Sequence, residues 1–289
     1  MSSLLENSIR ECANALHQTA DKHLLFGGAL DGMKHHITCF ITLIRQALYP
    51  MVYGRCTICE DQSGNVEACL LAAGEKLYLL CQTAMDGKTT KGGKTAEEVA
   101  AMFFELLPDA AERLKEDVRA AYLGDPAAQS EEEILCAYPT FEALSVFRLA
   151  HILYTLEVPI LPRMMTEYAH QRTGIDIHPG ATIGKRFFID HGTGVVIGET
   201  CIIGDDVKIY QGVTLGAKSF ATDEQGHPIK GVHRHPRIGN GVVIYAGATI
   251  LGGDTYIGDG AVIGGNVWLT RSVPSKAIVT NQGIRLPED

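Results

Sequence analysis

The sequence lacks the features that mark a membrane or secreted protein. None of its apolar runs approaches the roughly 20 residues that span a bilayer, and it does not begin with a charged, apolar and small-residue leader. It also lacks a basic excess, because 25 Lys and Arg face 34 Asp and Glu for a formal net charge of -9. These absences predict a cytoplasmic protein without membrane contact, and they disfavour nucleic-acid binding, which needs a basic face.

Paired cysteines are also scarce. The eight cysteines are scattered over 289 residues, a length that can bury a substantial core without disulfides, so we interpret them as reduced thiols. Cys56 and Cys59 form a CxxC, but a zinc knuckle needs a second close pair, which the sequence does not have. No metal site is predicted, and the role of Cys56 and Cys59 stays open.

What the second half of the chain does contain is an aliphatic residue at every sixth position. The step forms four runs: Ile177, Ile183 and Ile189; Ile197, Ile203, Ile209 and Leu215; Ile238, Ile244 and Ile250; and Leu251, Ile257, Ile263 and Leu269. Such a period with frequent Gly predicts a parallel β-helix, in which each hexad forms one short strand and its corner. The polar stretch at 216–236 is predicted to be a loop that leaves the solenoid.

The first half of the chain has helical apolar spacing and no six-residue period. Apolar residues recur at three- and four-residue steps in the segments 4–16, 37–48, 66–85 and 141–156. Thr95 and Glu98 form a capping-box pattern that begins another helix. The sequence therefore predicts an α+β fold with an α-helical domain at 1–160, a β-helix at 161–273 and a tail at 274–289.

Four motifs in the repeat region resemble those of one acyltransferase family. IDIHP at 175–179, IDHGTGVVIGET at 189–200, VTLGA at 213–217 and RHPRIG at 234–239 are similar to motifs of the serine O-acetyltransferases, which are hexapeptide-repeat enzymes. The resemblance covers about residues 120–273. It implies a left-handed β-helix and transfer of acetyl from acetyl-CoA to the hydroxyl of L-serine, giving O-acetyl-L-serine and CoA in cysteine biosynthesis.

His191 lies at a two-residue slip in the repeat, after Ile189, where a side chain can leave the solenoid wall. Acetylation of an alcohol needs a base for the hydroxyl proton, and histidine is the usual residue. The resemblance implies that His191 is this base and that Asp176 orients its imidazole. The two residues are about one coil apart, so they are expected to be stacked neighbours.

The resemblance also assigns the substrate contacts. Four positions match those that hold the amino and carboxylate groups of the acceptor: Asp125, Asp190, Arg234 and His235. The charges agree, since an Asp suits an ammonium and an Arg suits a carboxylate. Acetyl-CoA is expected to be a cosubstrate, with no other cofactor. Its thioester oxygen would receive a backbone N–H at Gly216-Ala217, the corner after the repeat strand, and its pantetheine arm would lie along Ala246 and Gly265.

The sequence departs from the family at three places. It has Gly216-Ala217 where the family has Gly-Gly, and it lacks a Gly-x-Pro-Ala segment after the last coil, so the residues that hold the CoA nucleotide are not identified. It ends in Leu286-Pro287-Glu288-Asp289 and not in the Ile with which members insert into cysteine synthase, so that complex is not predicted. The resemblance implies a homotrimer or a dimer of trimers.

Other functions stay open on the sequence. A hexapeptide-repeat O-acetyltransferase with a related acceptor would share most of these residues. A γ-type zinc carbonic anhydrase also has a trimeric β-helix, in which three histidines bind zinc between subunits, and its candidates here are His191, His227 and His233. A noncatalytic scaffold is the third alternative, but it leaves the Asp, His and Arg set unexplained.

Overall fold

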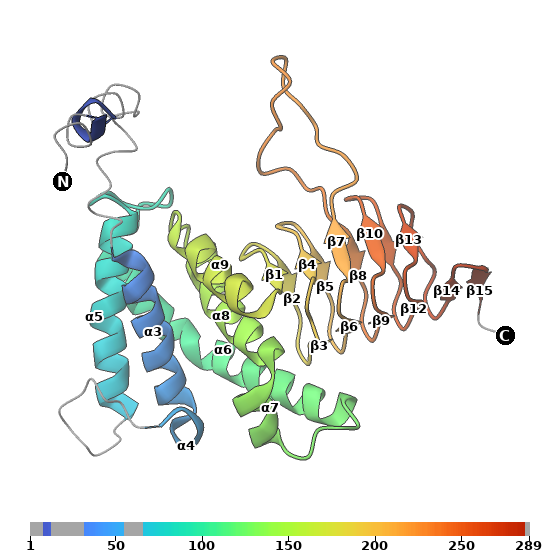
Figure 1. The fold of residues 1–289 in the computed structure, drawn as a ribbon, viewed down its shortest axis with the longest axis horizontal. Helices are drawn as coiled ribbons and strands as arrows, with labels where there is room; N and C mark the ends of the chain where they lie inside the picture. The colour runs from blue at the N-terminus through green and yellow to red at the C-terminus, as the bar shows by residue number, and fades with distance from the viewer. Residues whose placement is uncertain (1–7, 13–31, 55–65, 287–289) are drawn as a thin grey trace.

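The computed structural model describes residues 8–12, 32–54 and 66–286. Its helices gather at one end of the molecule and its β-strands extend away from them in a stack of coils (Figure 1). The helices are α3 (Met33–Leu48), α4 (Pro50–Tyr53), α5 (Val66–Ala84), α6 (Ala96–Gly124), α7 (Glu131–Ala137), α8 (Pro139–Thr155) and α9 (Leu161–Thr173). Cys56, Cys59 and most of the first expected helix lie outside the described residues.

The helical end has its own apolar core, to which α3, α5, α6, α8 and α9 all contribute. The predicted capping box begins α6, because the Thr95 side chain accepts the Glu98 N–H and the Glu98 carboxylate accepts the Thr95 N–H. Among the described residues, no helix is both long and apolar enough to cross a bilayer.

The predicted domain boundary at residue 160 is wrong. Helix α9 occupies residues 161–173, and the first strand begins only at Asp176. Pro162 lies in the first turn of α9, where a proline costs no hydrogen bond, so this proline is compatible with the start of a helix. Gly174 ends α9 in a left-handed conformation with φ 70°.

The remaining chain winds into a parallel β-helix with three sheets. Its strands are β1 (Asp176–Ile177), β2 (Thr182–Ile183), β3 (Phe188–Asp190), β4 (Val196–Ile197), β5 (Ile202–Ile203), β6 (Lys208–Tyr210), β7 (Thr214–Gly216), β8 (Arg237–Ile238), β9 (Val243–Ile244), β10 (Thr249–Leu251), β11 (Tyr256–Ile257), β12 (Val262–Ile263), β13 (Trp268–Leu269), β14 (Ile278–Thr280) and β15 (Gly283–Arg285). The sheet orders are β1-β4-β7-β10-β13, β2-β5-β8-β11 and β3-β6-β9-β12-β14-β15.

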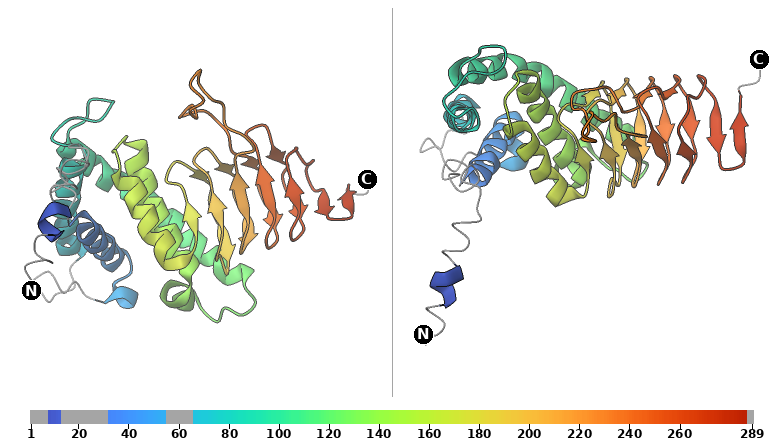
Figure 2. Two further views of the ribbon diagram at one scale, coloured as in Figure 1. Left: turned by 45° about the horizontal axis from the view of Figure 1, so that its top comes forward. Right: turned by 90° about the horizontal axis from the view of Figure 1, so that it is seen from above.

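The six-residue aliphatic period is the buried column of this β-helix. In one sheet the register stacks Ile183 on Ile203, Ile203 on Ile238 and Ile238 on Ile257, and all four side chains are buried. Each coil therefore covers the apolar interior of the next. The expected loop leaves the coils between β7 and β8 and projects outward (Figures 1 and 2).

The tail predicted at 274–289 is wrong in part. β14 pairs parallel with β12 and extends the solenoid, and β15 folds back antiparallel on β14 at the far end of the stack (Figure 2). The six-residue repeat ends before this point, but Val279 still buries its side chain in the column. Residues 287–289 are not described.

A buried ion pair ties the helical end to the first coil. Arg148 of α8 donates to Asp117 of α6 at 2.9–3.1 Å, and also to the carbonyl oxygens of Ile183 and Gly184 at 2.7 Å each. Asp117 in turn accepts the N–H of Phe187 at 2.9 Å. Arg148 and Asp117 are therefore structural residues that join two helices to the first coil.

Candidate active site

His191 lies at a corner of the first coil with its side chain outside the solenoid wall. The side chain is 73% exposed, and its backbone is left-handed with φ 58°. Gly192 follows with φ 92°, and a Cβ there would lie 2.4 Å from Ile175 Cδ1, so glycine is required. The slip in the repeat thus forms a tight corner that exposes His191.

Two of the predicted substrate residues lie at the same corner. Asp190 ends β3, is largely buried, and has Oδ1 3.9 Å from His191 Nε2. Asp125 follows α6 and accepts the Tyr138 hydroxyl at 2.5 Å and the Ala127 N–H at 2.8 Å. These hydrogen bonds, first that of Tyr138, hold the pKa of Asp125 below its usual value. We call the corner that follows β3, β6, β9 and β12 the His191 edge.

Lys208 connects Asp190 to the end of α6. Its Nζ lies 3.2 Å from Asp190 Oδ2 and donates to the Gly124 carbonyl oxygen at 2.7 Å. Gly124 packs directly on Phe188, since a Cβ at this position would lie 2.9 Å from the ring. The helical end therefore presents Asp125 to the β-helix through close backbone contact.

Asp176 does not contact His191 among the interactions of the described residues. It begins β1, and its Oδ1 lies 3.5 Å from Arg163 Nη1 of α9. Its backbone N–H donates to Val195, in the next coil. The pairing of Asp176 with His191 stays a prediction.

The other predicted substrate residues lie at a different corner, where the loop returns to the coils. Arg234 Nη2 donates to Glu199 Oε2 at 2.6 Å, and the Tyr154 hydroxyl donates to Glu199 Oε1 at 3.0 Å. Burial acts to raise the pKa of Glu199, but these two donors hold it below its usual value. We call the corner that follows β1, β4, β7 and β10 the Arg234 edge.

His235 is fixed as a neutral imidazole at the Arg234 edge. Its Nδ1 accepts the Thr200 N–H at 3.1 Å and lies 2.9 Å from the Thr200 hydroxyl. The ring lies directly on Gly198, where a Cβ would come within 2.1 Å of it. Burial, and then the charge of Arg234, lower the pKa of His235 to about 4. Nε2 therefore carries the proton and is an N–H donor.

His235 should make the protein less stable in acid. Histidine in the unfolded chain titrates near 6.5, whereas His235 in the folded chain titrates at about 4. Between these pH values the unfolded state binds more protons, so the free energy of unfolding falls as the pH falls. His235→Asn should lessen this fall, as measured by thermal unfolding from pH 7 to pH 4. His227→Asn, in the exposed loop, is the control, and an unchanged pH slope for His235→Asn would contradict the expectation.

The predicted acetyl-CoA residues divide between the two edges. Gly216 ends β7 and Ala217 begins the loop, at the Arg234 edge. Ala246 and Gly265 lie one above the other at the His191 edge, since a Cβ on Gly265 would be 3.3 Å from the Ala246 carbonyl oxygen. Within one chain, the five-stranded sheet that contains β4 and β7 separates the two edges.

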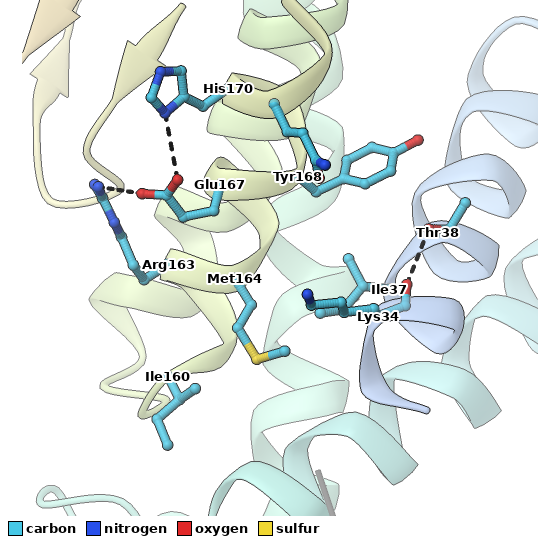
Figure 3. A pocket seen from close by; sticks show the side chains of 10 residues that line it. Lys34, Ile37, Thr38, Ile160, Arg163, Met164, Glu167, Tyr168 and His170 are labelled. Carbon is cyan, nitrogen blue, oxygen red and sulfur yellow. Dashed lines mark hydrogen bonds and ion pairs between the residues drawn. The ribbon is translucent and has the colours of Figure 1, made fainter. Parts of the chain in front are cut away.

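The three histidines of the carbonic anhydrase alternative do not meet within the described chain. His227 pairs with Asp223 in the loop at 3.6 Å, and His233 donates to the Gly253 carbonyl oxygen at 3.0 Å. In the described part, a different group has ligand atoms within 4.8 Å of one another: Glu167, His170 and Asp176. Figure 3 shows Glu167 and His170 beside Arg163. The Arg163 guanidinium pairs with the carboxylates of Glu167 and Asp176.

Sequence reasoning missed several residues that support the predicted ones. Glu199 belongs to the IDHGTGVVIGET motif and lies next to a repeat strand, so the sequence did contain a signal that this residue is part of the site. Tyr138, Tyr154 and Lys208 offered none, because each reaches its partner from a separate element: Tyr138 reaches Asp125, Tyr154 reaches Glu199, and Lys208 reaches Asp190.

Several serine acetyltransferases are similar to this chain, although no family model matches it. A plasmid serine acetyltransferase of Synechococcus elongatus is 60% identical over 190 residues, which are 66% of this chain and 59% of that protein, so the chain spans less than two thirds of its length. The serine acetyltransferase of Mycobacterium tuberculosis is 46% identical over 166 residues, 57% of this chain and 68% of that one. The structure of Entamoeba histolytica serine acetyltransferase 1 in complex with L-cysteine matches with a TM-score of 0.74 at 34% identity, covering 87% of this chain and 98% of that chain. The chain belongs to the serine acetyltransferase family.

Proposed function

We propose that the protein transfers the acetyl group of acetyl-CoA to the hydroxyl of L-serine, giving O-acetyl-L-serine and CoA. The observation that carries the proposal is the distribution of charge in the candidate site. Asp190 lies beside His191, and Asp125 is held at the same corner through the contact of Gly124 with Lys208, while Arg234 and the N–H donor of His235 lie at the other edge. The ammonium of an amino acid would pair with Asp125 and Asp190, and its carboxylate would pair with Arg234 and His235. Membership of the serine acetyltransferase family supports the same reaction.

The proposed transfer is direct, within a complex of both substrates. His191 removes the serine hydroxyl proton as the oxygen attacks the thioester carbon, and Asp176 orients the imidazole in the assembled site. The backbone N–H of Ala217 stabilises the oxyanion that forms. Collapse of this intermediate breaks the C–S bond, and His191 returns the proton to the departing CoA sulfur. Ala246 and Gly265 flank the pantetheine arm.

We infer that the site is completed between chains of a homotrimer. The base and the proposed ammonium partners lie at the His191 edge, whereas the proposed carboxylate partners lie at the Arg234 edge, on the far border of a sheet. A serine molecule is too small to reach across that sheet. Contact between the His191 edge of one chain and the Arg234 edge of another would unite the two sets, and pairing through the helical ends would give a dimer of trimers.

An acceptor panel with acetyl-CoA tests the reaction by following release of the free thiol. L-Serine should be the best acceptor. Ethanolamine lacks the carboxylate and 3-hydroxypropionate lacks the ammonium, so each should have a kcat/KM about 10- to 100-fold lower, the usual cost of one charge-assisted contact. If ethanolamine were acetylated as well as L-serine, the assignment of serine would fail, and a related alcohol would be the acceptor.

Complementation between two inactive variants tests the shared site. His191→Ala and Arg234→Ala lie at different edges, so mixed trimers should contain some sites with both residues intact and regain thiol release. His191→Ala mixed with Asp190→Ala is the control, because both changes lie at one edge and no site would be repaired. If neither mixture regained thiol release, although two affinity tags verified that mixed trimers had formed, the whole site would lie within one chain.

A further inference from the structure

Lys208 places a largely buried charge on the outer wall of the β-helix. It lies in β6, in register with Phe188 of β3, and its side chain is only 20% exposed. A lysine on an outer wall would ordinarily extend its ammonium into water. Here Nζ lies 4.9 Å from the ring centre of Phe188 and 4.7 Å from that of Tyr210, two contacts of the cation–π type.

The ammonium group of Lys208 also meets two negative partners from different parts of the chain. One is the Gly124 carbonyl oxygen at 2.7 Å, at the carboxyl end of α6, where the helix dipole favours a cation. The other is Asp190 Oδ2 at 3.2 Å. Asp125 follows Gly124 directly. Lys208 therefore contacts the backbone next to Asp125 and the side chain of Asp190.

This arrangement determines which oxygen of Asp190 is available. Lys208 occupies Oδ2, so Oδ1 is the oxygen that faces His191, at 3.9 Å from Nε2. Asp125 and Asp190 together have two negative formal charges, and Lys208 leaves the three side chains with a net charge of one negative unit. A single substrate ammonium would neutralise this charge. The unmodified corner is therefore matched in charge to an acceptor with one amino group.

We propose that Lys208 is a positioning residue that sets Asp190 relative to Asp125 and so determines the recognition of a single substrate ammonium beside His191. This role rests on the proposed acetyl transfer to serine. It does not require that Lys208 touch the substrate. It predicts that loss of the lysine weakens acceptor binding selectively, because Lys208 acts through Asp190, a proposed ammonium partner, and not through the proposed acetyl-CoA residues.

Steady-state kinetics of Lys208→Met test this role. Methionine has a similar length and can remain between the two rings, but it lacks the charge, so KM for L-serine should rise about 10-fold, as for one charge-assisted contact. KM for acetyl-CoA should stay within twofold. Lys208→Arg retains a cation and should recover most of the serine affinity. Lys230→Met, in the exposed loop, is the matched control and should behave as the unmodified protein.

Chemical rescue separates positioning from a general structural effect. Lys208→Ala leaves a space bordered by Phe188, Tyr210 and Asp190, and methylammonium in the assay should lower its raised KM for L-serine at least threefold. The same salt should not improve the unmodified protein or Lys230→Met. The role would be overturned if methylammonium did not lower the raised KM of Lys208→Ala for L-serine. It would also be overturned if the KM of Lys208→Met for L-serine were within twofold of the unmodified value.

The same experiment distinguishes failure of this role from failure of the proposed function. If the unmodified protein acetylates L-serine and the Lys208 variants match it, only the role of Lys208 fails. If the unmodified protein neither binds L-serine by calorimetry nor acetylates it, the proposed function and the role fail together.

Discussion

Replacing His191 with alanine should lower kcat for acetyl transfer to L-serine by about 10²- to 10⁴-fold, the usual contribution of a positioned acid or base. The side chain lies outside the wall and contacts Asp190 only at 3.9 Å, so its loss should leave the fold intact. KM for acetyl-CoA should change little, because the proposed role concerns the hydroxyl proton.

Thiol release under saturating acetyl-CoA measures this effect, with thermal unfolding to verify that the variant is folded. His227→Ala is the matched control, since it removes an exposed loop histidine, and it should retain full turnover. If His191→Ala kept its turnover within a few fold of the unmodified protein, His191 would not be the base.

Replacing Arg148 with methionine should destabilise the protein by about 3–5 kcal/mol, the usual cost of leaving one buried charge without its partner. Arg148 and Asp117 are both buried, and the loss would also free the Ile183 and Gly184 carbonyl oxygens. Burial already raises the pKa of Asp117 to about 6, against the opposing effect of Arg148. Without the guanidinium, Asp117 must be protonated or remain buried as an unpaired anion.

Denaturant unfolding at pH 7 measures this loss. The double variant Arg148→Met with Asp117→Leu should recover part of it, because an apolar pair leaves no buried charge. Arg186→Met is the control, since Arg186 pairs with Asp206 at the exposed surface, and it should have a much smaller effect. An Arg148→Met variant as stable as the Arg186→Met variant would contradict the expected contribution of the buried pair.

Features that depend on local periodicity were predictable from the sequence. A six-residue aliphatic step requires coils of one length that bury one face, so the β-helix, its buried column and the excluded loop follow from the pattern. The Thr95 and Glu98 capping box was readable because both partners lie within one turn. The slip at residues 190–194 marked the exposed corner, since extra residues there cannot remain in the wall.

Features that depend on how distant segments meet were not predictable. Helix α9 was missed because the signal near its start, Pro162, suits a helix start as well as a break. The hydrogen bonds of Lys208 to Gly124 and of Arg148 to Asp117 join residues 84 and 31 positions apart, and no spacing rule indicates such partners.

The sequence by itself determined the kind of fold and the types of residue that the chemistry needs, because both are written in short repeating motifs. Only the tertiary structure decided that Asp125, Asp190 and His191 share one edge while Arg234 and His235 lie at another. The physical reason is that the corner at which a residue lies depends on the cumulative length of every preceding strand and turn. A two-residue slip shifts the position of every later residue relative to the earlier coils. Motifs that are read separately do not reveal this cumulative length.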